Sequence, residues 1–205
     1  MALLGRHTSP EQMQEFNISP DQEIFNLEEL VKFFDLKRVQ KAGAVFNIDK
    51  LNWLNAQYLK LLTDKDLAKL LVVDNTKIIA LVRERMKKIS DFQALAGPLL
   101  VLGDYATELL IWKESPREVI LDNLKESLRI FSATLAADFN QASLNKTIGL
   151  LAEQRGKGEV FWPIRVALSG QKNSPGPLEV AEALGKKETV KRMESAIKKL
   201  ENEKL

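Results

Sequence analysis

The chain has 205 residues, of which 45% are hydrophobic and 28% charged, a composition typical of a soluble globular protein of one large or two small domains. Its net charge of +2 is too small to indicate a nucleic-acid partner by itself, because most charge runs are solvated faces. It has no apolar run of about 18 residues, no signal-peptide pattern and no cysteine, so we expect no membrane partner and a reducing, cytoplasmic location.

Apolar residues recur at three- and four-residue steps along most of the chain, which predicts an all-α protein. The first such segment, residues 46–59 (FNIDKLNWLNAQYL), begins near Asp49, which can cap it. On this helix Trp53 and Tyr58 are predicted to lie in the core, because aromatic side chains are usually buried. Residues 74–95 (DNTKIIALVRERMKKISDFQAL) predict one long amphipathic helix whose buried stripe includes Val82, Met86 and Ile89.

The same periodicity continues to the end of the chain. It predicts helices over residues 117–131, 144–156 and 188–200. Breaks in the pattern fall at residues 61–66 and 114–118. We therefore predict three parts, residues 1–62, 63–114 and 115–205.

Residues 161–180, FWPIRVALSGQKNSPGPLEV, predict two helices around a turn. Pro163 suits the first helical position and Gly170 the residue just past a helix end. Ser174–Pro175 then suit an N-cap and first turn, and the second helix is predicted to run to Gly185. Two buried helices would thus hold one exposed loop.

The sequence contains few of the residue patterns that are typical of catalytic sites. It contains no phosphate-binding GxxxxGK[ST] loop, no strand-led GxGxxG, no HExxH and no GxSxG, and its one histidine, His7, has no metal-ligand pattern around it. We therefore predict no catalytic residue and no metal site. The residues alone indicate an all-α binding module.

Three side chains near the turn have alternative roles. Arg165 interrupts an apolar helix, so its guanidinium must reach either a buried acidic partner or the surface of the loop. Phe161 and Trp162 either stack on nucleic-acid bases or are buried under the helices.

Two blocks of this sequence, SPDQEIFNLEELVKFFDLKRVQKAGAVFNIDKLNWLNAQYL and FWPIRVALSGQKNSPGPLEVAEALGKKETVKRMESAI, resemble the C-terminal half of a bacterial-type glutamyl-tRNA synthetase. The resemblance implies a partial stem-contact region in residues 1–62, followed by two helical anticodon-binding modules. The parent reaction is the ATP-dependent attachment of glutamate to its tRNA. The family's His-x-Gly-His and Lys-Met-Ser-Lys signatures do not occur here, so we expect the catalytic domain, with its ATP and Mg²⁺, to be absent and this chain alone to be inactive.

The resemblance also implies roles for single residues. It implies that Arg85 reads the third anticodon base and favours glutamate tRNA, whose anticodon ends in C, over glutamine tRNA, whose anticodon ends in G. The alternative for Arg85 is an exposed salt bridge with a neighbour such as Glu84 or Asp91. It implies contacts to the first two anticodon bases from Arg165, Ser174, Pro175, Gly176 and Pro177, although many family members carry a larger apolar residue in place of Pro177. The side chains that could also meet the sugar-phosphate backbone are Asn52, Asn55, Lys87, Lys88 and Lys172. We expect glutamate tRNA as the partner, no DNA, no cofactor in this chain, and a monomer.

Two alternatives remain at this point. The chain could be a free-standing helical regulator that binds tRNA, or a protein-interaction module that kept the fold but not the RNA. Salt dependence separates these alternatives, because an RNA complex weakens steeply as salt rises while an apolar protein interface does not.

Overall fold

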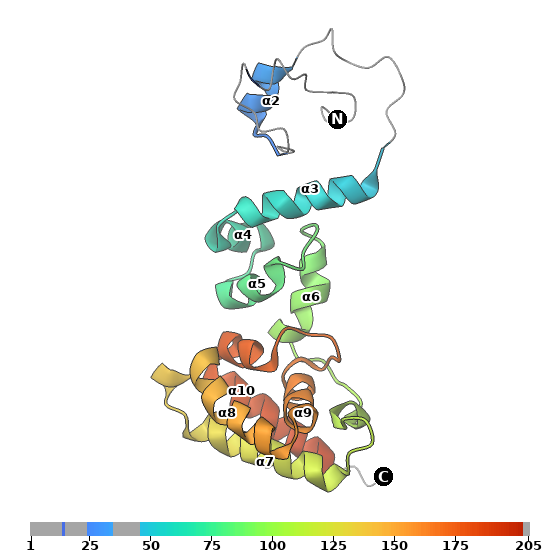
Figure 1. The fold of residues 1–205 in the computed structure, drawn as a ribbon, viewed down its shortest axis with the longest axis vertical. Coiled ribbons are helices and arrows are strands. Elements are labelled where there is room, and N and C mark those ends of the chain that lie inside the picture. Colours follow the sequence, from blue (N-terminus) through green and yellow to red (C-terminus); the bar gives the residue numbers. More distant parts are fainter. Residues whose placement is uncertain (1–13, 15–23, 35–45, 203–205) are drawn as a thin grey trace. The chain divides into compact units, whose positions relative to one another are not determined.

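A computed structural model describes residue 14 and residues 24–34 and 46–202. Within these residues the regular structure is helical and contains no β-strand, so the predicted all-α class is confirmed. His7 lies outside the described residues. No described helix is long and apolar enough to cross a membrane. The chain divides into two compact units, Met1–Leu61 and Leu62–Leu205, whose helices are labelled in Figure 1.

The first unit contains α2 (Leu27–Phe33) and α3 (Ile48–Leu61). Helix α2 starts with a capping box, in which the Asn26 side chain accepts from the Glu29 N–H and the Glu29 carboxylate accepts from the Asn26 N–H. The Tyr58 hydroxyl on α3 donates to the carbonyl of Phe25 at 2.6 Å. This bond ties the end of α3 to the start of α2.

The structure corrects two predictions about α3. Asn47, rather than Asp49, caps the helix, because the Asn47 Oδ1 accepts from the Lys50 N–H at 3.0 Å. Trp53 and Tyr58 were predicted to lie in the core but are 41% and 40% exposed. Five residues on a helix turn a side chain through about 140°, so these two rings do not share a face.

The second unit opens with three short helices, α4 (Asp64–Leu71), α5 (Thr76–Arg83) and α6 (Asp91–Leu100). The prediction of one helix over residues 74–95 is therefore wrong. The Asp91 carboxylate at the start of α6 accepts from the N–H groups of Lys87 at 2.9 Å and Lys88 at 3.1 Å, which stabilises the turn between α5 and α6. In the turn between α5 and α6, Met86 stays buried whereas Ile89 is exposed, against its prediction.

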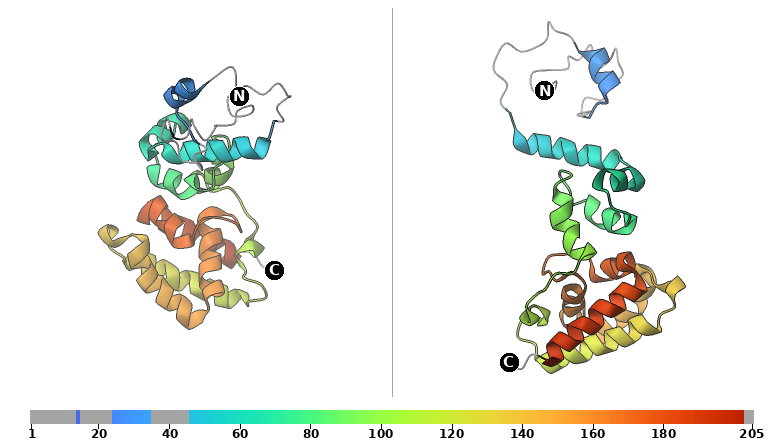
Figure 2. Two further views of the ribbon diagram at one scale, coloured as in Figure 1. Left: turned by 45° about the horizontal axis from the view of Figure 1, so that its top comes forward. Right: turned by 180° about the vertical axis from the view of Figure 1, so that it is seen from behind.

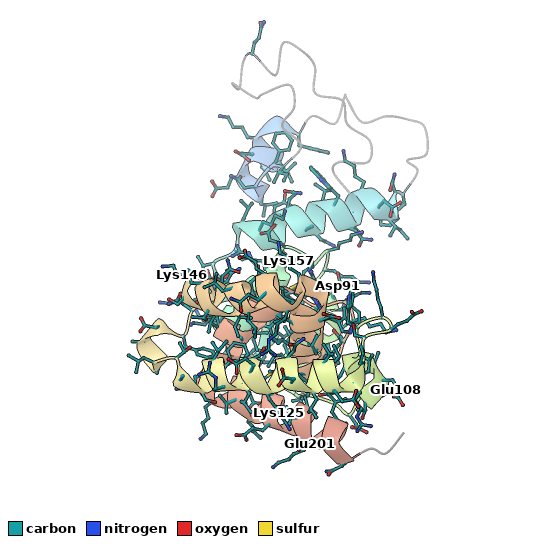
Figure 3. All side chains as sticks on the ribbon, turned by 60° about the horizontal axis from the view of Figure 1, so that its bottom comes forward. Asp91, Glu108, Lys125, Lys146, Lys157 and Glu201 are labelled. Atoms are coloured by element: carbon teal, nitrogen blue, oxygen red, sulfur yellow. The ribbon has the colours of Figure 1, made fainter. Side chains whose placement is uncertain are left out.

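The rest of the second unit is a bundle of four longer helices. Its elements are η2 (Thr107–Leu110), α7 (Arg117–Ala133), η3 (Ala136–Asp138), α8 (Gln141–Arg155), α9 (Lys157–Ser169) and α10 (Pro177–Asn202). Helix α10 packs against α9, α7 and α8, and its course along α7 is visible from behind in Figure 2. The Lys125–Glu201 ion pair (2.7 Å) joins α7 to the last turns of α10, where both residues are labelled in Figure 3. The helices predicted over residues 117–131 and 188–200 are confirmed, and that over 144–156 is correct to within one residue at its end.

Helix α9 starts earlier than predicted. It begins at Lys157, after Gly156 at φ 99°, and contains Pro163 in its interior rather than at its first position. A proline there leaves the carbonyl four residues back without its helical donor. That carbonyl belongs to Glu159, and the Asn123 side-chain amide on α7 donates to it at 3.1 Å. The buried Asn123 thus compensates for the missing N–H and joins α7 to α9.

A pair of tryptophans closes the bundle beside η2. The Trp162 Nε1 donates to the Leu109 carbonyl at 2.8 Å, and its ring lies 5.0 Å from that of Trp112. Gly158 packs so tightly against Trp112 that a Cβ on Gly158 would lie 2.2 Å from the Trp112 Nε1. Trp162 is therefore engaged within the protein, as one of its two alternatives predicted.

Candidate nucleic-acid interface

The loop between α9 and α10 runs from Gly170 to Gly176. Gly170 ends α9 in the left-handed conformation (φ 66°), which confirms its predicted place just past the helix. Helix α10 begins at Pro177, two residues later than predicted, and the Gly176 N–H donates to the Glu179 carboxylate at 3.0 Å. Gly185 interrupts α10 with φ 77°, at the place where the second helix was predicted to end.

Only part of this loop is exposed. Lys172 and Asn173 are exposed at its apex, whereas Ser174, Pro175 and Pro177 are buried. The prediction of an exposed loop therefore holds at its apex and is wrong for its second half. The Ser174 hydroxyl donates to the Pro175 carbonyl at 3.0 Å instead of capping a helix.

Arg165 holds the buried half of the loop in place. Its Nη1 donates to the carbonyls of Ser174 and Pro175, the latter at 2.9 Å, and lies 3.3 Å from the Ser174 Oγ. Of the two predicted destinations, the guanidinium thus reaches the loop and not an acidic side chain. A planar group with several donors can hold several acceptors at once, which a lysine cannot do.

Arg85 approaches the same loop from the turn after α5. Its Nη2 lies 3.5 Å from the Ser174 carbonyl, at the long end of the hydrogen-bond range. Asp91, a possible salt-bridge partner, is occupied by the backbone of Lys87 and Lys88. The exposed Arg85 therefore has donors left for a further acceptor.

The charges around Ser174 are predominantly positive. Burial and the nearby Arg85 lower the pKa of Arg165, while Glu179 raises it. The carboxylate of Glu179 is shared with the Gly176 N–H and with the Gln141 side-chain amide, at 3.0 and 3.3 Å. Two guanidinium groups beside one partly used carboxylate favour ligands that accept hydrogen bonds.

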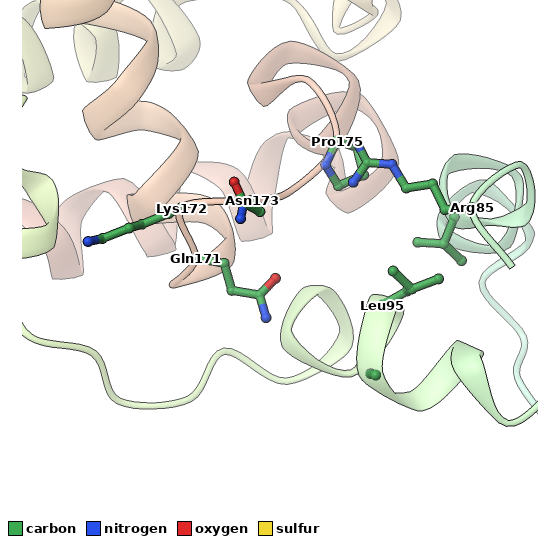
Figure 4. Close-up of a pocket in the computed structure, with 8 residues that line it drawn as sticks. Arg85, Leu95, Gln171, Lys172, Asn173 and Pro175 are labelled. Atoms are coloured by element: carbon green, nitrogen blue, oxygen red, sulfur yellow. The ribbon is translucent and has the colours of Figure 1, made fainter.

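Arg85 and the loop meet over a groove of about 340 Å³ inside the second unit. Figure 4 shows the Arg85 side chain extending toward Pro175, with the Gln171 amide and Leu95 along the groove. The groove is lined by Val82, Arg85, Ala94, Leu95, Gln171, Lys172, Asn173 and Pro175. It combines an apolar wall from α5 and α6 with a polar wall from the loop.

This groove brings together some of the predicted residues and adds others. Arg85, Lys172 and Pro175 line it. Gln171 and Asn173 were not predicted, although two amides flanking a lysine between Gly170 and Ser174 are a sequence signal for a polar loop apex. Side-chain amides carry donors and acceptors on one plane, which suits base edges.

The remaining predicted residues lie outside the groove lining. Lys87 and Lys88 are exposed in the turn between α5 and α6. Asn52 and Asn55 lie one turn apart on α3 in the first unit and are half-buried. In the described part of the chain, no three His, Cys, Asp or Glu side chains form a group that could hold a metal ion.

Comparison with known proteins gives a consistent family. A family model described as an anticodon binding domain matches residues 27–197. The glutamate–tRNA ligase of Clostridium tetani is 33% identical over 203 residues, which cover 92% of this chain and 41% of that protein. That of Flavobacterium psychrophilum is 33% identical over 202 residues, which cover 89% and 38%. The chain thus spans about two-fifths of the length of the curated relatives it matches.

A solved structure shows the same likeness. It is the crystal structure of a glutamate tRNA ligase from Elizabethkingia meningosepticum in complex with its amino acid, with a TM-score of 0.75 and 28% identity over 95% of this chain and 39% of that one. The resemblance to glutamyl-tRNA synthetases is therefore confirmed. Because the family model covers most of the sequence, this chain belongs to the anticodon-binding domain family.

Proposed function

We propose that this chain binds the anticodon loop of glutamate tRNA, as the anticodon-binding part of a glutamate–tRNA ligase. The observation that carries this proposal is the groove in which Arg85 faces the loop of residues 171–176. Its volume of about 340 Å³ lies within the range of about 300–1,000 Å³ usual for ligand pockets. The names of the relatives support the choice of tRNA.

The loop side and the Arg85 side of the groove suit different anticodon bases. Unstacked bases are recognised by hydrogen bonds to their edges and by stacking on flat or apolar side chains. We assign the first two anticodon bases to the loop, with Arg165, Ser174, Pro175, Gly176 and Pro177. We assign the third base to Arg85, whose fork can donate to the acceptor edge of a cytosine.

We assign contacts with the sugar-phosphate backbone to the other predicted side chains of both units. The exposed Lys87, Lys88 and Lys172 offer charge to phosphates. Asn52 and Asn55 on α3 offer hydrogen bonds to the sugar-phosphate backbone. These contacts would contribute affinity without sequence preference.

In this proposal, the attachment of glutamate to tRNA takes place in another part of the enzyme. The sequence lacks the phosphate-binding and synthetase signatures, so we assign glutamate attachment, ATP and Mg²⁺ to parts of the enzyme outside these residues. The chain alone is then a tRNA-binding monomer that does not aminoacylate. We place it in the cytoplasm, because it has no cysteine.

Footprinting and salt-dependent binding test the proposal. Full glutamate tRNA should be protected at its anticodon loop and open at its acceptor end, and binding should weaken steeply with salt. Lys172→Ala should reduce the slope of log affinity against log salt by about one. Lys146→Ala, an exposed lysine on α8 labelled in Figure 3 that does not line the groove, is the charge-matched control and should leave the footprint unchanged.

Two results of these experiments would contradict the proposed function. Protection confined to the acceptor stem would exclude an anticodon-binding role. Affinity that barely changes with salt would favour a protein-interaction module instead.

A further inference from the structure

We propose that Arg192 is a positioning residue for anticodon recognition, because it fixes the two walls of the groove to each other. This inference rests on the proposed function. Arg192 lies on α10, away from the residues that line the groove, and is only 4% exposed. A buried guanidinium is costly unless its donors are satisfied, so its partners show what it organises.

Those partners are the ends of two other helices. The Arg192 Nη1 donates to the Leu168 carbonyl in the last turn of α9 at 2.7 Å. Its Nη2 donates to the Leu99 carbonyl in the last turn of α6 at 2.9 Å. Helix C-termini carry carbonyls without helical donors and a partial negative charge, so one cation stabilises both ends at once.

Helix α10 holds this cation in a fixed orientation. Glu188, one turn back on α10, accepts from the Arg192 Nε at 2.8 Å. Glu188, on the same helix as Arg192, therefore fixes the orientation of the guanidinium plane that contacts α6 and α9. A lysine would keep the charge but offer no planar fork to reach both helices.

Both helices are connected to the groove. Helix α6 contributes Ala94 and Leu95 to the apolar wall. Helix α9 passes through Gly170 directly into Gln171, the first residue of the polar wall. Arg192 thus determines how far the loop stands from α6, and with it the width of the space offered to a base.

A distance measurement tests the positioning without any RNA. The chain has no cysteine, so cysteines introduced at the exposed Gln93 on α6 and Lys172 in the loop can carry one spin-label pair. Pulsed electron paramagnetic resonance should give one narrow distance distribution. Arg192→Lys should broaden it. The matched control is Thr189→Val, which removes a buried hydrogen bond within α10, from Thr189 Oγ1 to the Ala181 carbonyl, and should leave the distribution narrow.

Binding then tests the consequence for recognition. On the cysteine-free chain, the preference for anticodon hairpins is the affinity for an anticodon that ends in C divided by the affinity for one that ends in G. Arg192→Lys should lower this ratio by about tenfold, which corresponds to the loss of one base-specific contact. Thr189→Val should keep that ratio. If Arg192→Lys does not fold, Glu188→Gln, which weakens the hold on the Arg192 Nε, should change both readouts in the same direction by a smaller amount.

Each contrary result would reject a specific part of the proposal on Arg192. An unchanged distribution in Arg192→Lys, or equal broadening in Thr189→Val, would reject the positioning role. Broadening with an unchanged base ratio would reject its link to recognition. Failure of the unaltered chain to bind the hairpins would instead reject the proposed function, while the distance result would still stand.

Discussion

Arg85 and Arg165 direct their guanidinium groups at the same acceptor, the backbone carbonyl of Ser174. Arg165 precedes Ser174 by 9 positions and binds it closely, whereas Arg85 precedes it by 89 positions and lies 3.5 Å away. Arg165 therefore stabilises the loop, whereas Arg85 has hydrogen-bond donors left for a further acceptor. This difference predicts different consequences for their replacement.

Arg85→Gln should remove base discrimination while keeping stability. Arg85 is exposed and makes one long hydrogen bond, so the free energy of unfolding should change by no more than about 0.5 kcal/mol. Affinity for two tRNAs that differ only in the third anticodon base should show a preference for C in the unaltered chain and lose most of it in the variant.

The control for Arg85 is Lys88→Gln, which removes an exposed cation from the same turn. It should weaken binding of both tRNAs alike, as a phosphate contact does. An unchanged ratio in Arg85→Gln would make Arg85 an ordinary surface charge.

Arg165→Ala should destabilise the protein as well as weaken tRNA binding. It removes the Arg165 donor from the carbonyls of Ser174 and Pro175 and leaves them only the long Arg85 contact and the Ser174 hydroxyl, a loss of about 1–3 kcal/mol in the free energy of unfolding. Denaturant titration measures the loss, and amide hydrogen exchange should rise in residues 171–174 and at Gly176. Arg129→Ala, an exposed arginine paired with Glu126, serves as control and should change little. Equal stability of both variants would contradict the bracing role.

Gly158→Ala should destabilise the bundle, although alanine is the better helix former. The new Cβ would lie 2.2 Å from the Trp112 Nε1, and crowding of about 1–3 kcal/mol should outweigh a propensity gain of about 1 kcal/mol. Denaturation followed by tryptophan fluorescence measures the balance. Gly149→Ala on α8 is the matched control, because its Cβ meets nothing closer than 3.4 Å and should stabilise the protein. Similar effects from both substitutions would refute the close packing of Gly158.

Tyr105 should make the protein less stable at high pH. Burial, and secondly the charge of Asp104, raise its pKa from 10.0 to about 12. Folding therefore favours the neutral phenol, so its contribution is complete below pH 10 and is lost as the pH rises from about 10 to about 12, by roughly 2–3 kcal/mol.

Tyr105→Phe isolates this effect, because it removes the titrating group and a buried hydroxyl that has no hydrogen-bond partner among the described residues. The difference in unfolding free energy between the unaltered chain and the variant should shift in favour of the variant across this pH range. Titration of ultraviolet phenolate absorbance in a Tyr58→Phe background should place the Tyr105 transition near pH 12, since the chain has only 2 tyrosines. A constant difference would contradict the shift.

Local signals predicted much of the fold. Gly170 marks the end of α9 because a left-handed residue is needed there, and the apolar periods of α7 and α10 agree with their packing. The break at residues 84–90 escaped prediction because the apolar period runs through it, and the turn is stabilised by hydrogen bonds from the Lys87 and Lys88 N–H groups to the Asp91 side chain, which the period does not reveal. The interior Pro163 depends on Asn123, which is distant in sequence.

The candidate site was predicted less completely than the fold. Family resemblance pointed to Arg85 and to the loop, but the hydrogen bonds that use up most of Arg165 arise from tertiary structure. Arg192 gave one signal, a cation between Thr189 and Met193 on a buried stripe. Its two targets, the ends of α6 and α9, are set by packing and not by local sequence.

The Glu179 carboxylate lies at the start of α10, where it determines whether the helix N-terminus can accept an anion. The first N–H groups of a helix form a natural seat for a phosphate, but here the Gly176 N–H is already occupied by the protein's own anion. A phosphate at this helix end would meet negative charge instead of a free donor. A phosphate is therefore disfavoured on the α10 side of the loop, so that under the proposed function bases enter the groove from the side of Arg85.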